Sequence, residues 1–262
     1  MGRGVAWTGL ARTSGPLMQP CFEGHVQISR MDYWFRLGLI KAPKGAKGYA
    51  AMLQGTRPQT KRGNALTLIE FLYDFASPNC YVAYHKLREM SAKRKIELRM
   101  VPLFLGGLFK MTQDAPVPRG SNEYAYMVRN LERISGAVGI EFHFPHSLFP
   151  INSVRALRGS YFAESEGRTH EYVSRLFEEY WAKGTDISTT DNLGQIVESL
   201  KLDRTRFSEF IEREETKRRL RDETTSAYER GVFGAPTYFV DGEMYWGTPE
   251  VLWFLDERLP HD

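Results

Sequence analysis

The order of elements along the chain predicts an α/β fold in which a β–α–β unit and a β-hairpin flank a long helical block. Three observations carry this prediction. Residues 66–105 read as strand, helix and strand, residues 122–231 read as helix almost throughout, and Asp241-Gly242 divides two short apolar runs. The composition, with 42% hydrophobic and 26% charged residues, is typical of a globular protein.

The β–α–β unit opens with LTLIEFLYDF at 66–75, which is rich in β-branched and aromatic residues and short enough for a buried strand. Ser77 and Pro78 then start a helix, because Ser caps the first turn and Pro needs no N–H at the first helical position. The helix continues through NCYVAYHKLREMSAKR, and IELRMVPLFL at 96–105 is the second strand. A right-handed crossover makes the two strands a parallel pair.

The middle of the chain predicts a helical insertion over about 118–230. Helices are expected in the segments 122–139, 152–167, 169–184, 189–200 and 203–231, the last as two helices. Asn152 is the expected N-cap of the second segment, and glycines end four of the five. The Glu/Lys/Arg run at 212–222 is most simply a solvated helix face.

A hairpin and a helix complete the predicted domain, which spans 65–262. The sequence APTYFVDGEMYWG has the Asp-Gly pair of a two-residue hairpin turn. The final segment, TPEVLWFLDERL, begins with Thr248 as N-cap and Pro249 at the first helical position.

Residues 1–64 differ from the rest of the chain in composition. They hold ten Lys/Arg and two acidic residues, whereas the remainder holds 25 basic and 30 acidic residues. Without a sustained hydrophobic period, this segment is expected to be a disordered basic extension. We expect a cytoplasmic protein, or one of the mitochondrial matrix if residues 1–64 are a presequence.

The composition also excludes several classes of function. Two cysteines, Cys21 and Cys80, are too few for a disulfide framework, and no apolar run is long enough to span a membrane. The mildly acidic body argues against nucleic-acid binding. His143 and His146 lack a companion cluster of carboxylates or cysteines, so we expect no metal.

The stretch SPNC lies at a helix start where redox proteins carry Cys-x-x-Cys, and Ser77 stands in the position of the first Cys, the first redox position. Backbone N–H groups at a helix N-terminus favour negative charge, and a sulfur held there is stabilised as a thiolate. With Ser77 in the first position, that thiolate must come from another molecule, to which the hydroxyl donates a hydrogen bond. The alternative is that Ser77 is only an N-cap. Cys80, one turn further on, is either a small buried hydrophobe or the site of a mixed disulfide with a bound thiol.

The second candidate segment is GVFGAPTYFV, in which Ala235-Pro236 opens a strand after a Gly-containing turn. This position suggests a cis peptide bond. The backbone N–H and C=O beside it are then open to an extended peptide, which would add to the sheet as a further strand.

Together these segments resemble thioredoxin-fold proteins of the DsbA type, which carry a helical insertion between the two halves of the fold. With Ser in the first redox position, the chain is similar to kappa-class glutathione transferases and, more closely, to 2-hydroxychromene-2-carboxylate isomerases. The resemblance covers about 66–258 and is carried by FLYDFASPNCYVAYHKL, FLGGLFKMTQ, FPINSVRALRGSYFAE, YWAKGTDIS and GVFGAPTYFVDGEMYWGTPEVLWFLDERL.

The resemblance implies that glutathione is the cofactor and that its sulfur lies near the catalytic Ser77 hydroxyl. The other implied glutathione-binding residues are Pro78, Asn79, Asp114, Ala235, Pro236, Gly247 and Thr248. The implied substrate-binding residues are Asn152, Arg155 and Trp246. The sequence departs from the family where Asp114 replaces an Asn, where Glu123 stands near a Lys position, and where Pro249 replaces an Asp or Asn.

The leading hypothesis is a glutathione-dependent isomerase, in which the thiolate adds transiently to an aromatic-derived substrate. This chemistry belongs to aromatic catabolism, and the resemblance implies a homodimer that acts on a small molecule. The alternatives are a kappa-like transferase or peroxidase, a thiol–disulfide oxidoreductase acting through Cys80, and a thioredoxin-fold binding module without catalysis. Arg155 either binds a substrate carboxylate or is a surface residue, and Asn152 either binds substrate or only caps a helix.

Overall fold

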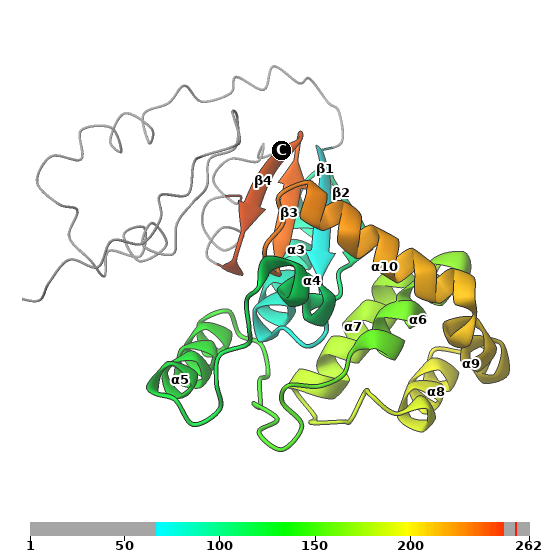
Figure 1. Ribbon diagram of the computed structural model, residues 1–262, viewed down its shortest axis with the longest axis horizontal. Helices are drawn as coiled ribbons and strands as arrows, with labels where there is room; N and C mark the ends of the chain where they lie inside the picture. The colour runs from blue at the N-terminus through cyan, green and yellow to red at the C-terminus, as the bar shows by residue number, and fades with distance from the viewer. Residues whose placement is uncertain (1–66, 249–254, 256–262) are drawn as a thin grey trace, which may run out of the picture. The chain divides into compact units, whose positions relative to one another are not determined.

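A computed structural model describes residues 67–248 and residue 255, which belong to the unit Lys61–Asp262 (Figure 1). The predicted extension at 1–64 and its boundary lie outside the described residues and stay predictions. Of the predicted final helix, only Thr248 and Leu255 are described. No helix within 67–248 is both long and apolar enough to cross a membrane.

The sheet has four strands in the order β2-β1-β3-β4. Its strands are β1 (Thr67–Tyr73), β2 (Ile96–Pro102), β3 (Thr237–Val240) and β4 (Glu243–Trp246). As predicted, β1 and β2 are parallel, while β3 is antiparallel to both β1 and β4. The hairpin turn is also confirmed, with φ values of 52° at Asp241 and 85° at Gly242. Asp and Gly tolerate such positive φ values, which a two-residue hairpin of this type requires.

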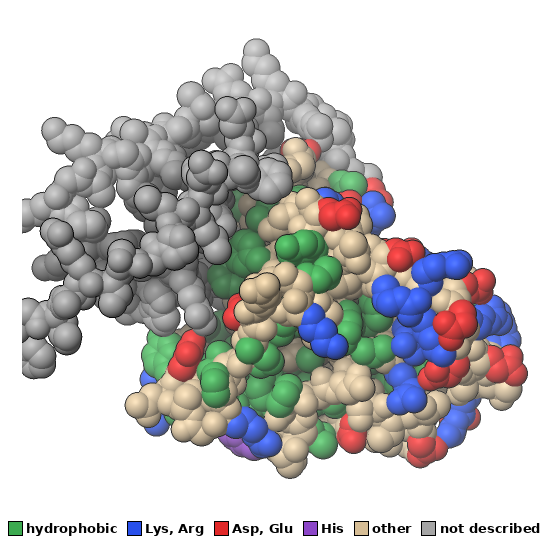
Figure 2. Space-filling model, viewed as in Figure 1, with side chains coloured by type: hydrophobic (Ala, Val, Ile, Leu, Met, Phe, Trp, Pro, Cys, Tyr) green, Lys and Arg blue, Asp and Glu red, His purple; other side chains and the backbone are tan. Residues whose placement is uncertain are grey.

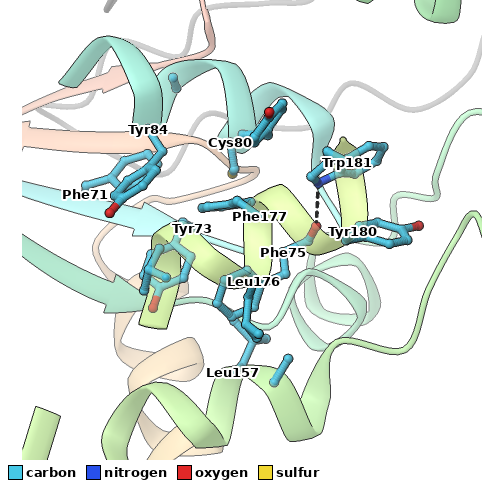
Figure 3. Packing of buried hydrophobic residues seen from close by; sticks show 14 of the residues in the cluster. Phe71, Tyr73, Phe75, Cys80, Tyr84, Leu157, Leu176, Phe177, Tyr180 and Trp181 are labelled. Carbon is cyan, nitrogen blue, oxygen red and sulfur yellow. Dashed lines mark hydrogen bonds between the residues drawn. The ribbon is translucent and has the colours of Figure 1, made fainter. Parts of the chain in front are cut away.

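Helix α3 (Pro78–Lys93) links β1 to β2 and packs on one face of the sheet. Alternate residues of β1 point to this face, where Phe71 stacks on Tyr73 at a ring separation of 5.6 Å. Helix α7 (Thr169–Trp181) adds Phe177, whose ring lies 5.0 Å from that of Phe75 (Figure 3). This aromatic core fixes the end of β1 from which α3 departs.

The opposite face of the sheet is covered by α4 (Leu105–Thr112) and α10 (Glu214–Glu229). A second apolar cluster joins these elements: Leu72, Leu103, Leu108, Ala227, Val232 and Phe239. The outer surface of α10 carries interspersed basic and acidic side chains (Figure 2), in agreement with the solvated helix face expected from its sequence.

The second strand ends earlier than predicted. It stops at Pro102, and Leu105, the last residue of the predicted strand, begins α4 instead. The backbone N–H groups of Phe104 and Leu105 bond to Thr224 Oγ1 at 3.2 Å and to Asp74 Oδ2 at 2.9 Å. These distant partners, which a local pattern does not reveal, satisfy the free donors at the helix start.

The predicted helical insertion is confirmed in its helical character. It contains α5 (Asn122–Ala137), α6 (Val154–Ser165), α7, α8 (Thr190–Ser199), α9 (Arg204–Glu212) and α10. One detail was wrong, since the N-cap of α6 is Ser153. Asn152 still accepts a hydrogen bond from Val154 N at 3.2 Å, so its side chain serves the same helix start from one position earlier.

Candidate active site at the start of helix α3

Ser77 caps α3, and its hydroxyl faces the turn before β3. The N-cap has extended backbone angles, φ −94° and ψ 115°, and its Oγ accepts a hydrogen bond from Cys80 N at 3.3 Å. The same hydroxyl donates to the carbonyl oxygen of Ala235 at 3.2 Å. With 5% of its surface exposed, Ser77 lies at the bottom of the site. This hydrogen bond therefore joins the start of α3 to the Ala-Pro turn, although Ser77 and Ala235 are 158 residues apart.

The Ala235-Pro236 peptide bond is cis, as the sequence suggested. Within residues 67–248, the Ala235 N–H has no hydrogen-bond partner. The Pro236 carbonyl accepts from Gly247 N at 3.0 Å, which ties the turn to the end of β4. One backbone donor next to Ser77 is thus open for an extended ligand.

The other end of the site is formed by Asn79 and Thr248. Thr248 Oγ1 donates to Asn79 Oδ1 at 2.9 Å, so the first turn of α3 is bonded to the segment after β4. Trp246 lies against the Ala-Pro turn, because a Cβ atom added to Gly234 would be 2.6 Å from its Nε1. Its ring is 5.0 Å from that of Phe233, which is 36% exposed.

Cys80 is fully buried beneath Ser77. Burial raises the pKa of the Cys80 thiol to about 12, although a hydrogen bond with Ser77 opposes the shift. At neutral pH the side chain is therefore a neutral thiol, and thiolate is the form that attacks disulfides. This environment favours the small buried hydrophobe over the mixed-disulfide role.

Asp74 belongs to the site but was not singled out from the sequence. Its carboxylate accepts from Ala76 N and Leu105 N, each at 2.9 Å, and also bonds with Ser153. Its carbonyl accepts from Ser77 N at 3.0 Å. Burial raises its pKa above the usual range, and the hydrogen bonds partly offset this. An acidic residue directly after a buried strand was the available signal.

Three predicted residues have contacts away from this cluster. Asp114 is exposed, and its carboxylate accepts from Ala115 N at 2.8 Å. Arg155 is exposed and pairs with Glu212 at 3.0 Å, which favours a surface role. Asn152 is exposed at the start of α6. No contact within 67–248 joins these side chains to Ser77, so their ligand-binding roles stay predictions.

The two histidines considered for a metal have other contacts. His143 Nδ1 lies 2.8 Å from the Ala182 carbonyl, and His146 Nδ1 lies 3.3 Å from the Tyr124 hydroxyl. Within the described part of the chain, no three His, Cys, Asp or Glu side chains are grouped as metal ligands.

The chain forms a mixed four-stranded sheet with a helical insertion, and Ser77 caps a helix opposite a cis-proline. These features define a thioredoxin-fold protein with Ser in the first redox position. The chain belongs to the DsbA-like thioredoxin domain family, whose sequence model matches residues 68–257.

Proteins similar to this chain include isomerases and glutathione transferases. The chain is 29% identical over 190 residues to 2-hydroxychromene-2-carboxylate isomerase of Pseudomonas sp. (strain C18), covering 70% of this chain and 86% of the relative. It is 24% identical over 196 residues to glutathione S-transferase kappa 1 of Rattus norvegicus, again covering 70% and 86%. A solved structure of 2-hydroxychromene-2-carboxylate isomerase matches with a TM-score of 0.66 and 26% identity, covering 72% of this chain and 93% of that one.

Proposed function

We propose that this protein is a glutathione-dependent isomerase acting on a carboxylate-bearing, aromatic-derived substrate of the 2-hydroxychromene-2-carboxylate type. The observation that carries the proposal is the Ser77 hydroxyl, held at the N-terminus of α3 and 3.2 Å from the carbonyl beside the cis-proline. The isomerase named among the similar proteins supports the choice of reaction.

Glutathione would bind as an added strand beside the Ala-Pro turn. The Ala235 N–H, which has no hydrogen-bond partner within residues 67–248, donates to the cysteinyl carbonyl of glutathione, and the Ala235 carbonyl accepts from the cysteinyl N–H. In the free protein that carbonyl accepts a hydrogen bond from the Ser77 hydroxyl. When the cysteinyl N–H of glutathione becomes the donor to this carbonyl, the Ser77 hydroxyl is released and turns toward the sulfur of the ligand. Binding itself therefore frees the group that stabilises the thiolate.

The start of α3 supplies the remaining stabilisation of the thiolate. The helix macrodipole places about half a positive elementary charge at its N-terminus, and the effect is strongest within the first turn. Pro78 has no N–H to offer, so the nearby donors are the Ser77 hydroxyl and the amides of the first turn. Both favour the ionised form of a sulfur placed there and so lower its pKa. Asn79 and Thr248, already bonded to each other, offer polar groups for another part of the tripeptide.

The isomerisation needs no oxidant and consumes no glutathione. The hemiketal ring of the substrate first opens to a conjugated keto form, and the hydroxyl proton passes to the phenolic oxygen. The thiolate then forms a C–S bond to the electrophilic carbon of that form, and the electron pair of the C=C bond moves onto the carbonyl oxygen as an enolate. The former double bond can then rotate. When the enolate collapses, the C–S bond breaks, the double bond re-forms and the thiolate leaves unchanged. Trp246 and the half-exposed Phe233 offer an apolar wall for a planar substrate beside the turn.

A kappa-like transferase is the second candidate, favoured by the rat relative. It would use the same thiolate but would keep the C–S bond and expel a leaving group from the substrate. The two candidates thus share Ser77 and differ in the fate of the adduct.

Turnover of 2-hydroxychromene-2-carboxylate, measured with and without glutathione, tests the proposal and separates the candidates. An isomerase gives glutathione-dependent conversion with glutathione fully recovered, whereas a transferase consumes it. Ser77→Ala should lower kcat/KM by about 10²-fold, in the range seen when one stabilising donor is removed. The matched control is Ser91→Ala on the exposed part of the same helix, which should leave turnover unchanged. Equal turnover in wild type and Ser77→Ala would overturn the mechanism.

The proposal includes a homodimer. Light scattering coupled to gel filtration of the full chain tests it, and a mass of 30.2 kDa would contradict it.

A further inference from the structure

Within the described residues 67–248, the Tyr180 hydroxyl is a buried hydrogen-bond donor without a partner. Tyr180 lies on α7 with none of its surface exposed, and its hydroxyl has no hydrogen-bond partner within residues 67–248. Its neighbours on α7 contrast with it, because Tyr172 bonds to the Ala156 carbonyl at 3.0 Å and Trp181 to the Phe75 carbonyl at 2.9 Å. Native structures seldom leave such a donor unused, because its desolvation is then not recovered.

The Tyr180 hydroxyl lies near enough to Asp74, three residues before Ser77, for the charge of that carboxylate to act on it. In Figure 3 it points away from Phe75 and Phe177, out of the aromatic core. Burial raises the pKa of Tyr180, and the nearby charges of Asp186 and Asp74 raise it further. Asp74 belongs to the turn that presents Ser77. The hydroxyl therefore stays protonated at neutral pH and can act as a donor.

The three titratable side chains that act on Tyr180 (Asp74, Asp186 and Tyr124) already have hydrogen-bond partners of their own. Asp74 holds two backbone N–H groups, and Asp186 accepts from Ser188 N at 2.9 Å. Tyr124 of α5 has its hydroxyl 3.3 Å from His146 Nδ1. Within residues 67–248, the Tyr180 hydroxyl thus has no acceptor, although these three side chains beside it have hydrogen-bond partners. This contrast points to an acceptor brought by a ligand.

We propose that Tyr180 donates a hydrogen bond to the substrate oxygen that becomes negatively charged when the thiolate adds. This inference rests on the proposed function and extends it, because it assigns the group that receives the enolate. A neutral donor aimed at a developing oxyanion in a water-poor site stabilises the transition state more than the ground state. Substrate would enter on the side of α5, where Tyr124 packs against Phe144 and Phe149.

Tyr180→Phe tests the inference, with Tyr172→Phe as the matched control on the same helix. Removing an unpartnered hydroxyl should leave Tm unchanged or slightly raised and glutathione affinity unchanged, while kcat/KM for 2-hydroxychromene-2-carboxylate falls at least tenfold. Tyr172→Phe should lower Tm, because the Ala156 carbonyl loses its donor, and should leave kcat/KM unchanged. A Tyr180→Phe variant whose kcat/KM is within twofold of wild type would overturn the inference and leave the isomerase proposal standing.

A binding measurement separates this inference from the proposed function. Salicylate, a planar aryl carboxylate with a phenolic oxygen, is titrated into wild type and Tyr180→Phe by calorimetry. If the wild type shows no glutathione-dependent turnover but binds salicylate at least tenfold more tightly than Tyr180→Phe, the proposed function is wrong and the oxygen-binding role of Tyr180 stands. Absence of turnover together with equal salicylate binding in both proteins would overturn both.

Discussion

Trp181→Phe tests how the core holds the active-site turn. The indole N–H donates to the Phe75 carbonyl at 2.9 Å, two residues before Ser77, and Trp181 is fully buried (Figure 3). Leaving that buried carbonyl without a donor costs about 1–3 kcal/mol. The smaller ring buries roughly 50 Å² less of the 150–250 Å² typical of an aromatic side chain. At about 25 cal/mol per Å², this is about 1 kcal/mol.

The expected loss in the free energy of unfolding is therefore about 2–4 kcal/mol, measured by urea denaturation. Glutathione affinity should also fall, because the turn that presents Ser77 loses an anchor. Phe162→Leu is the control, since its ring packs on Phe207 in the helical insertion and should cost stability without changing glutathione affinity. A Trp181→Phe variant within 0.5 kcal/mol of wild type would refute the reasoning.

Three further outcomes follow from single residues. Cys80→Ala should leave glutathione-dependent turnover within twofold of wild type. A Cys21→Ser variant, which keeps only Cys80, should show no adduct by intact mass after oxidised glutathione is added, and an adduct would contradict the inert role of Cys80. Gly159→Ala should lower Tm and reduce the free energy of unfolding by about 1–3 kcal/mol. The new Cβ would meet the Tyr172 hydroxyl and lie 2.7 Å from Phe207 Cε2. An unchanged Tm would argue against this close packing. Because burial raises the Asp74 pKa, the folded state retains its proton longer, so stability should fall as pH rises above 3.8. Asp74→Asn should lack this pH-dependent loss of stability in urea titrations between pH 4 and 7. Parallel stability profiles for the wild type and the variant would contradict the raised pKa of Asp74.

The parts of the fold that the sequence predicted well depend on neighbouring residues. Ser77-Pro78 fixes the start of α3, and Asp241-Gly242 fixes the hairpin, because cap and turn chemistry act over a few residues. The start of α4 could not be read in the same way. Its N–H groups find partners on Thr224 and Asp74, which are distant in sequence.

The two glycines of α4 make a packing contact that the sequence does not reveal. A Cβ atom on Gly106 or Gly107 would come within 2.9 Å of the Phe104 ring. The glycines let this ring fold over the first turn of the helix, so they serve close packing rather than a break. A contact of this kind depends on where one side chain lies and has no periodic pattern.

The residues of the candidate site also include some that local sequence predicted and others that it did not. Helix capping predicted the place of Ser77, whereas the grouping of Ser77 and Ala235 in one glutathione site came from the resemblance to a family, since 158 residues separate them. Asp74 and Tyr180 were missed because their importance lies in burial and in their partners, which only the folded chain defines. Arg155 matched a family pattern, but its guanidinium pairs with Glu212 on the surface.

The most direct test of the central claim is the thiol pKa of bound glutathione, followed by ultraviolet absorbance of the thiolate in wild type and Ser77→Ala. If Ser77 stabilises the thiolate, the thiol pKa of glutathione bound to the wild type lies well below that of free glutathione. In Ser77→Ala it reverts toward the free value while binding persists. An equal thiol pKa in the two complexes would contradict the assignment of Ser77 as the group that stabilises the thiolate.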